Sequence, residues 1–187
     1  IAKEIGGFDT AGGRSILGYL RDTGKNTAQK WQTGDAKGKV GAAFLAARAA
    51  LKMGAGTVTV ELMHKDGPSF DPMCPELMVT DEPVDLSTAD AIVIGCGMGF
   101  SEEAKARLIA AIETNVPVII DADALTMIAN DQELEDMVLS RRQHTVLTPH
   151  PGEAARILKR TIAEIQADRL TTAREISIQT GAITVLK

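Results

Sequence analysis

The stretch "AIVIGCGMGFSEEAKARLIAAIETNVPVIID" (residues 91–121) decides the fold. It begins with a short apolar run, passes through a glycine-rich turn into a helical pattern, and closes with a second apolar run. Ser101 stands where a helix N-cap belongs, and two glutamates follow it in the expected first turn. A strand, a helix and a strand in this order predict a right-handed βαβ unit with parallel strands.

The same alternation extends on both sides of this unit. An alanine-rich helix is predicted over residues 40–54; its apolar residues fall on most faces, so we expect it to be largely buried and to end at Gly54. Residues 91–95 are expected to form a central strand. The other predicted elements are strands at 57–63, 117–121, 144–148 and 182–187, and helices at 101–115, 131–142, 152–160 and 161–181. Residues 1–187 are therefore expected to form a single α/β domain with a mostly parallel sheet covered on both faces.

The composition excludes several classes of protein. Of the 187 residues 44% are hydrophobic but only 3% aromatic, so the core must be built from Ala, Ile, Leu, Val and Met. The formal net charge of −5 disfavours a nucleic-acid partner, which calls for a basic face. No apolar run reaches membrane-spanning length, and Cys74 and Cys96 are too few for a disulfide framework. We therefore expect a cytoplasmic protein with neither nucleic acid nor membrane as a partner.

The N-terminal residues 1–33 do not follow this pattern. The stretch "AQKWQT" (28–33) is polar where a first core strand is expected, and glycine pairs interrupt the residues before it. We expect this segment to lack a buried first strand.

Three motifs follow predicted strands. The first is "GCGMG" (95–99), where glycines either serve a tight structural turn or let backbone N–H groups approach an anionic ligand. It is not the G-x-G-x-x-G dinucleotide fingerprint, because the third glycine comes one residue early. The second is "DADAL" (121–125), in which Asp121 either caps a helix or joins Asp123 in holding magnesium or orienting a hydroxyl.

The third motif is "TPHPGE" (148–153). Two prolines hold the backbone around His150 extended, so the imidazole is presented at the strand end and is more readily explained by function than by packing. Glu153 is either a first-turn acid favoured by the helix dipole or a magnesium contact. Because the carboxyl ends of parallel strands share one edge of a sheet, we expect all three motifs to converge on one site.

Together with "GAAFLAARAALKMGAGTVTV" (41–60), "PELMV" (75–79) and the terminal "AITVLK" (182–187), these motifs resemble the NAD(P)H-hydrate dehydratases of the ribokinase-like superfamily. The resemblance covers residues 34–187. It implies a ribokinase-like three-layer sandwich around a mostly parallel central sheet. It also implies a lyase that spends ADP or ATP, with Mg²⁺, to return NADH or NADPH hydrate to the intact cofactor.

The resemblance also assigns roles to individual residues. Ala42, Gly97, Gly99 and His150 would contact the hydrate, and Lys187 would begin the segment that lies along the nucleotide. Glu153 matches the position whose acid helps to hold magnesium in related kinases, with Asp121 and Asp123 in support. A homo-oligomer is implied in the same way.

Three departures from the family pattern matter. Before residue 34, "GKNTAQKWQTGD" (24–35) stands where the family has a Lys-Gly pair and an apolar strand that ends in two glycines. Cys96 stands where the family has a proline, and no G-T-G-D loop occurs within residues 1–187. The resemblance therefore implies a domain that is incomplete at its C-terminus, with the catalytic aspartate beyond Lys187. The alternatives are a small-molecule kinase of the same fold, disfavoured by "PELM" and by His150 in place of an asparagine, and a non-catalytic nucleotide-binding fragment.

Overall fold

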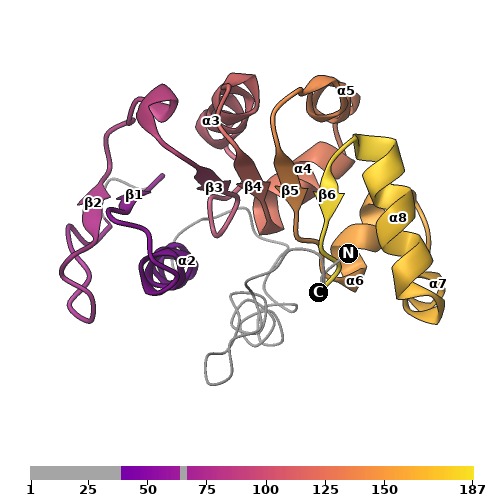
Figure 1. The fold of residues 1–187 in the computed structure, drawn as a ribbon, viewed down its shortest axis with the longest axis horizontal. Helices are drawn as coiled ribbons and strands as arrows, with labels where there is room; N and C mark the ends of the chain where they lie inside the picture. The colour runs from indigo at the N-terminus through magenta and orange to yellow at the C-terminus, as the bar shows by residue number, and fades with distance from the viewer. Residues whose placement is uncertain (1–38, 64–66) are drawn as a thin grey trace.

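The computed structural model describes residues 39–63 and 67–187, so the predictions made for residues 1–33 lie outside it. All of its strands are parallel, and they form a two-stranded sheet and a four-stranded sheet (Figure 1). The small sheet pairs β1 (Thr59–Glu61) with β2 (Met78–Thr80). The large sheet has the order β3 (Ile92–Ile94), β4 (Val118–Ile120), β5 (Thr145–Leu147) and β6 (Ile183–Thr184).

Helices connect the strands of the large sheet, as the sequence predicts, and a further helix precedes β1. They are α2 (Val40–Lys52), α3 (Glu102–Glu113), α4 (Ala122–Ala129), α5 (Gln132–Ser140), α6 (Pro151–Leu158), α7 (Ile162–Ala167) and α8 (Arg169–Thr180), with a short 3-10 turn at Leu86–Thr88. Within the described part of the chain, none of them has the length and apolarity needed to cross a membrane.

The βαβ unit that begins at residue 91 is confirmed. Ser101 caps α3 by accepting a hydrogen bond from the Ala104 N–H (3.2 Å), and Glu102 and Glu103 occupy the first turn. β3 and β4 pair in parallel, with Ile94 beside Ile120. The sequence signals for the helix between the two strands therefore predict correctly where β3 and β4 end. The motifs at 95–99 and 121–125 follow these two strand ends.

The main core lies around the large sheet and is aliphatic. Val118 and Ile120 of β4 and Leu147 of β5 are almost completely buried, whereas Ile119 and Val146 on the opposite face are half-buried. Helix side chains complete it, among them Leu108, Leu125, Leu134, Ile165 and Ile176. Each such side chain stabilises the fold by roughly 1.5–3 kcal/mol relative to an exposed position.

A second, smaller cluster lies between α2 and the small sheet. Phe44 and Ala47 of α2 meet Val60, Leu62 and Leu77 there. The expectation of a largely buried α2 is wrong, since only Phe44 and Ala47 of this helix are buried. The physical reason is that the packing recorded for α2 is against the small sheet, which covers one face of the helix.

Two further predictions need correction. β3 is an edge strand of the large sheet rather than a central one, and its Val93 is 48% exposed. The helix expected over residues 161–181 is broken at Asp168, whose backbone leaves the helical region (φ −146°) and whose carboxylate caps α8 through the Thr171 N–H (3.0 Å). Asp168 thus caps a new helix at a position where the apolar pattern alone predicts one continuous helix.

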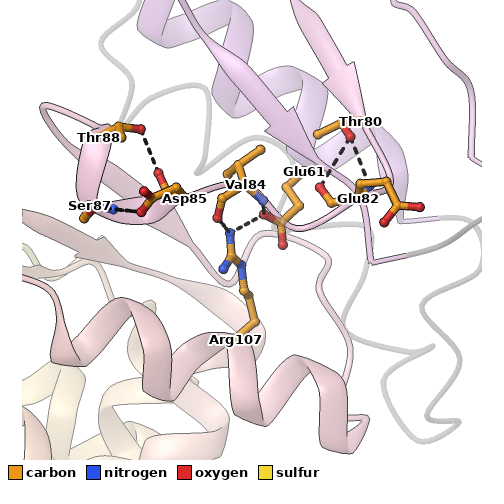
Figure 2. A network of polar contacts seen from close by, with 8 residues as sticks. All are labelled: Glu61, Thr80, Glu82, Val84, Asp85, Ser87, Thr88 and Arg107. Atoms are coloured by element: carbon orange, nitrogen blue, oxygen red, sulfur yellow. Dashed lines mark hydrogen bonds and ion pairs between the residues drawn. The ribbon is translucent and has the colours of Figure 1, made fainter.

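An arginine joins the small sheet to the large one (Figure 2). Arg107 of α3 donates to the carboxylate of Glu61 at the end of β1 and to the Val84 carbonyl (2.7 Å). The same carboxylate accepts the Val84 N–H at 3.0 Å. Both charged side chains are mostly buried, at 17% and 16% exposure, so this contact connects the two sheets in a partly dry environment.

Candidate active site

The three motifs lie along one edge of the large sheet, as predicted. The Asp121 N–H donates to the Ile94 carbonyl (3.0 Å), and the Thr148 N–H donates to the Ile120 carbonyl (3.1 Å). Beyond β6, the Lys187 N–H donates to the Pro149 carbonyl (2.9 Å). Figure 1 accordingly shows the end of β6 beside the start of α6. The carboxyl ends of β3, β4, β5 and β6 therefore present their following residues to one side.

A buried ion pair crosses this edge. The Lys187 ammonium lies 2.6 Å from Asp121 Oδ1, and the two side chains are 8% and 4% exposed. Asp121 occupies the N-cap position of α4, but its side chain makes no capping hydrogen bond, so the interpretation of this residue as a helix cap is wrong. Breaking a buried pair by removing one partner typically costs about 3–5 kcal/mol, because a charge is left unpaired.

His150 and Glu153 form a reciprocal cap at the start of α6. The imidazole Nδ1 accepts the N–H of Gly152 (2.9 Å) and that of Glu153 (3.3 Å), while Glu153 Oε2 accepts the His150 N–H at 2.8 Å. An Nδ1 that accepts two N–H groups carries no proton, so the proton sits on Nε2, which lies 3.2 Å from Glu153 Oε1. This contact is consequently a close approach between a neutral imidazole and a carboxyl group, and not an ion pair.

The surroundings shift both groups away from their ordinary ionisation. Burial, together with the charges of Lys187 and Arg156, lowers the pKa of His150 to about 4. Burial raises the pKa of Glu153 to about 7, against the opposing effect of Lys187. The His150 side chain nevertheless remains 42% exposed, whereas that of Glu153 is 2% exposed. The site thus offers a neutral, accessible imidazole backed by a buried carboxyl group.

Close packing requires the glycines of "GCGMG". At Gly95 (φ +112°) a Cβ atom would lie 1.8 Å from the Asp121 carbonyl oxygen, and at Gly97 (φ +75°) it would lie 2.6 Å from the Lys39 carbonyl oxygen. The Gly99 N–H donates to Asp123 Oδ2 (2.9 Å), inside the protein. The structural interpretation of Gly95 and Gly97 therefore holds, and the Gly99 N–H is occupied by a carboxylate of the protein itself rather than being open to an anionic ligand.

The cysteine that stands in place of the family proline is half-buried in this loop. Burial, reinforced by the nearby Asp121 carboxylate, raises the pKa of the Cys96 thiol to about 12. The side chain is therefore an uncharged thiol and not a reactive thiolate at neutral pH.

Lys39 connects the glycine loop to the start of α2. Its ammonium lies 3.5 Å from Asp123 Oδ2 and 5.8 Å from the centre of the Phe100 ring, and its carbonyl accepts the Ala42 N–H (3.0 Å). The sequence interpretation did not single out Lys39. Its only signal was its position just before the alanine-rich helix, which says nothing of a contact with a residue 84 positions away.

The structure therefore brings the predicted site residues together in two adjoining groups. Ala42, Gly97 and Gly99 gather around Lys39 and Asp123, and His150, Glu153 and Lys187 gather around Asp121. Asp121 and Asp123 lie at the start of α4 and so join the two groups.

Two further observations limit the chemistry of the cluster. His144 is exposed at the opposite end of β5, where its carbonyl accepts the Val118 N–H. Within residues 39–63 and 67–187, no set of three His, Cys, Asp or Glu side chains is arranged to hold a metal ion.

The chain is similar in sequence to one known family. The family profile described as NAD(P)H-hydrate dehydratase matches residues 34–187. An ADP-dependent (S)-NAD(P)H-hydrate dehydratase of Neisseria meningitidis is 37% identical over 160 residues, which are 82% of this chain and 53% of that protein. A bifunctional NAD(P)H-hydrate repair enzyme of Coxiella burnetii is 36% identical over 156 residues, 80% of this chain and 30% of that protein. The chain thus spans about half or less of the length of these curated relatives.

Solved structures extend the agreement to the fold. An ADP/ATP-dependent NAD(P)H-hydrate dehydratase of Bacillus subtilis matches with a TM-score of 0.63 and 27% identity, over 80% of this chain and 55% of that one. A ribokinase-like superfamily protein of Enterococcus faecalis matches with a TM-score of 0.64 and 26% identity, over 81% of this chain and 54% of that one. The ribokinase-like fold expected from the sequence is confirmed, and the chain belongs to the NAD(P)H-hydrate dehydratase family.

Proposed function

We propose that this chain contributes the hydrate-binding edge of an ADP- or ATP-dependent dehydratase that returns NADH or NADPH hydrate to the intact dinucleotide. The observation that carries the proposal is the cluster at the strand ends, where the neutral His150 imidazole, the buried Lys187–Asp121 pair and the glycine loop adjoin. In a parallel α/β sheet this is the edge at which ligands bind. The names of the relatives in Neisseria meningitidis and Bacillus subtilis support the same activity.

The hydrate would lie between the two groups of residues. Gly97 and Ala42 bring backbone and small side chains close to the ligand, which leaves room for a bulky dinucleotide. His150 would face the ligand with its exposed ring edge, while its Nδ1 remains engaged in the helix cap. A neutral imidazole can exchange the Nε2–H contact with Glu153 for one with a ligand hydroxyl without moving a charge.

Lys187 would face the phosphates of the nucleotide. Its ammonium is held at the strand ends by Asp121 and is nearly buried, so it is positioned before any nucleotide binds. A phosphate group that approaches the end of β6 would share this cation with Asp121.

Magnesium fits the donor set as a metal shared with the nucleotide. Magnesium binds oxygen ligands and usually keeps waters and substrate phosphates, so one or two protein carboxylates are enough. Glu153 and Asp121 supply such carboxylates, and a nearby divalent cation would favour the ionised form of Glu153, whose pKa burial raises to about 7. When bound, the metal supplies neutralisation of charge on the transferring phosphoryl group. Magnesium was present with ATP in the Bacillus subtilis crystals.

The test measures the absorbance of the dihydronicotinamide when the intact protein is mixed with NADH hydrate or NADPH hydrate. We expect the absorbance to rise only when ADP or ATP and Mg²⁺ are present. No rise with either nucleotide would contradict the proposal, and ATP consumption with a hydroxylated small molecule instead of the hydrate would favour a kinase. Homo-oligomerisation remains a separate prediction, to be measured by the mass of the protein in solution.

A further inference from the structure

Asp123 is buried in a way that helix formation does not explain. Its side chain is 0% exposed, and Oδ2 meets both the Gly99 N–H (2.9 Å) and the Lys39 ammonium (3.5 Å). Oδ1 is also buried and has no hydrogen-bond partner among the residues that the structure describes. A buried polar atom without a partner costs about 1–3 kcal/mol, whereas a first-turn acid gains only about 0.3–1 kcal/mol from the helix dipole. The position at the start of α4 therefore does not account for this carboxylate.

The contacts of Asp123 instead join three separate segments. They are the glycine loop after β3, the start of α4 after β4, and the residue before α2. Gly97 packs directly on the Lys39 carbonyl, and the same carbonyl accepts the Ala42 N–H. One carboxylate oxygen thus fixes both the glycine loop and the first turn of α2, which pack against each other on one side of the proposed hydrate pocket.

We propose that Asp123 is a positioning residue for the hydrate: it holds the Gly97–Gly99 loop in place against Lys39, the residue before α2. The inference rests on the proposed function, because it concerns the substrate of that same site. Asp123 does not itself touch the ligand, since no part of its side chain is exposed. Its effect should fall on the hydrate and not on the nucleotide, whose proposed contact, Lys187, is held by Asp121.

The test compares Asp123→Ala and Asp123→Asn in the intact protein. We expect Asp123→Ala to raise the KM for the hydrate by about tenfold or more, which corresponds to about 1.4 kcal/mol, and to leave the KM for ADP or ATP within about twofold. Asp123→Asn keeps an oxygen that accepts the Gly99 N–H but loses the charge that Lys39 requires, so it should recover part of the loss. Amide hydrogen exchange of Gly99 should accelerate in the alanine variant and less in the asparagine variant.

The matched control is Asp71→Asn. Asp71 is also a buried carboxylate (1% exposed) paired with a cation, Arg48, but it contacts none of the proposed site residues. It should lower stability and leave the KM for the hydrate unchanged.

An unchanged hydrate KM in Asp123→Ala, an equal rise in both KM values, or the same shift in Asp71→Asn would overturn the inference. A wild-type protein that fails to convert the hydrate contradicts the proposed function before any variant is compared. In that case, rapid hydrogen exchange of the wild-type Gly99 amide would also overturn the proposed role of Asp123 in holding the loop. Slow exchange of this amide that becomes fast in Asp123→Ala would support that role.

Discussion

At the scale of single residues, the imidazole of His150 has two tasks at different atoms. Nδ1 completes the first turn of α6, and the side chain, which is 42% exposed, is proposed to contact the hydrate. A substitution therefore acts on both stability and binding, and the two effects have to be separated. Asparagine is useful here because it caps helices well but presents no ring.

His150→Ala and His150→Asn should both lower kcat/KM for the hydrate by about tenfold or more, as expected for a lost hydrogen bond of roughly 1.4 kcal/mol. The alanine variant should also lose roughly 0.5–2 kcal/mol of stability with the cap, and the asparagine variant less. The measurements are hydrate turnover and denaturant unfolding. His144→Ala is the control, because this exposed residue lies at the other end of β5. Equal kinetics in the His150 and His144 variants would remove His150 from the site.

The opposite pKa shifts of His150 and Glu153 make a second prediction, about stability and pH. Between pH 4.5 and pH 6.5 the unfolded chain carries a protonated His150 and an ionised Glu153. The folded chain carries a neutral His150, whose pKa is about 4, and a protonated Glu153, whose pKa is about 7. Both states then bind one proton at this pair. The pair should therefore give no pH dependence of the free energy of unfolding in this range.

Substituting one member of the pair should reveal the pH dependence of the free energy of unfolding that the other member contributes. Glu153→Gln leaves only His150, whose unfolded form binds the extra proton, so stability should fall as the pH falls from 6.5 toward 4. His150→Asn leaves only Glu153, whose folded form binds the extra proton, so stability should fall as the pH rises from 4.5 toward 7. Each slope is at most about 1.4 kcal/mol per pH unit. Denaturant unfolding in magnesium-free buffer measures them, and parallel curves for the three proteins would contradict the prediction.

At the scale of helices and strands, the end of α3 is held by a side chain from another element. Arg141, just after α5, donates to the carbonyls of Ala111, Ile112, Thr114 and Val116 and to the Thr145 hydroxyl. These carbonyls lie at and beyond the last turn of α3, where the supply of helix N–H donors ends. The Ala111 carbonyl also accepts the Thr114 N–H (3.3 Å). The cation also lies at the negative end of the α3 dipole, which favours it further.

Arg141→Ala should therefore lower the free energy of unfolding by roughly 2–4 kcal/mol, because several carbonyls lose a charged donor. Arg142→Ala is the matched control: its side chain is exposed, and a change of less than about 0.5 kcal/mol is expected. Both variants lie at the end of the sheet opposite the strand-end motifs, so the KM for the hydrate should not change. A loss of stability as large in Arg142→Ala would contradict the assignment.

The elements that sequence reasoning predicted well are those with several agreeing signals. α3 has an N-cap serine, first-turn acids and an apolar stripe, and the structure begins it at the residue after Ser101. α4 was considered only as the helix that Asp121 would cap and was given no bounds, because "ADALTMIA" is only eight residues long and follows a strand directly. The edge position of β3 also escaped prediction, since an apolar run does not reveal which strands lie beside it.

The candidate site was predicted in outline and not in its connections. The order of strands and motifs was enough to bring Gly97, Asp121 and His150 to one edge. The Lys187–Asp121 pair joins residues 66 positions apart, and the Lys39–Asp123 pair joins residues 84 positions apart. No local pattern specifies such partners, because they depend on how strand ends stack in space.

At the scale of the whole molecule, the two sheets share no ladder of hydrogen bonds among residues 39–63 and 67–187. Side-chain contacts connect them: Arg107 of α3 pairs with Glu61 of β1, and Lys39 before α2 pairs with Asp123 at the strand ends. The first contact lies away from the proposed pocket and the second lies at it. The position of α2 relative to the glycine loop therefore depends on a small number of polar contacts.

Arg107→Ala should loosen the small sheet before the large one. Its loss leaves the Glu61 carboxylate largely buried without a cation, and we expect a cost of roughly 1–3 kcal/mol, less than for a fully buried pair. Amide hydrogen exchange should accelerate at β1 and β2 more than at β4 and β5. Lys105→Ala on the same helix, which removes a more exposed pair with Asp131, is the control. Uniform acceleration across both sheets would contradict the idea of a separable small sheet.

The tight packing of Gly95 and Gly97 also governs how the gene can vary. Every missense change of a glycine codon adds a Cβ atom, and at these two positions that atom would collide with a backbone carbonyl oxygen. At Gly41 and Gly56 the same added atom would meet nothing within 4 Å. A library of random variants selected for activity should therefore contain almost no survivors altered at codons 95 and 97, and many altered at codons 41 and 56. Neutral substitutions should therefore accumulate at Gly41 and Gly56 but not at Gly95 and Gly97.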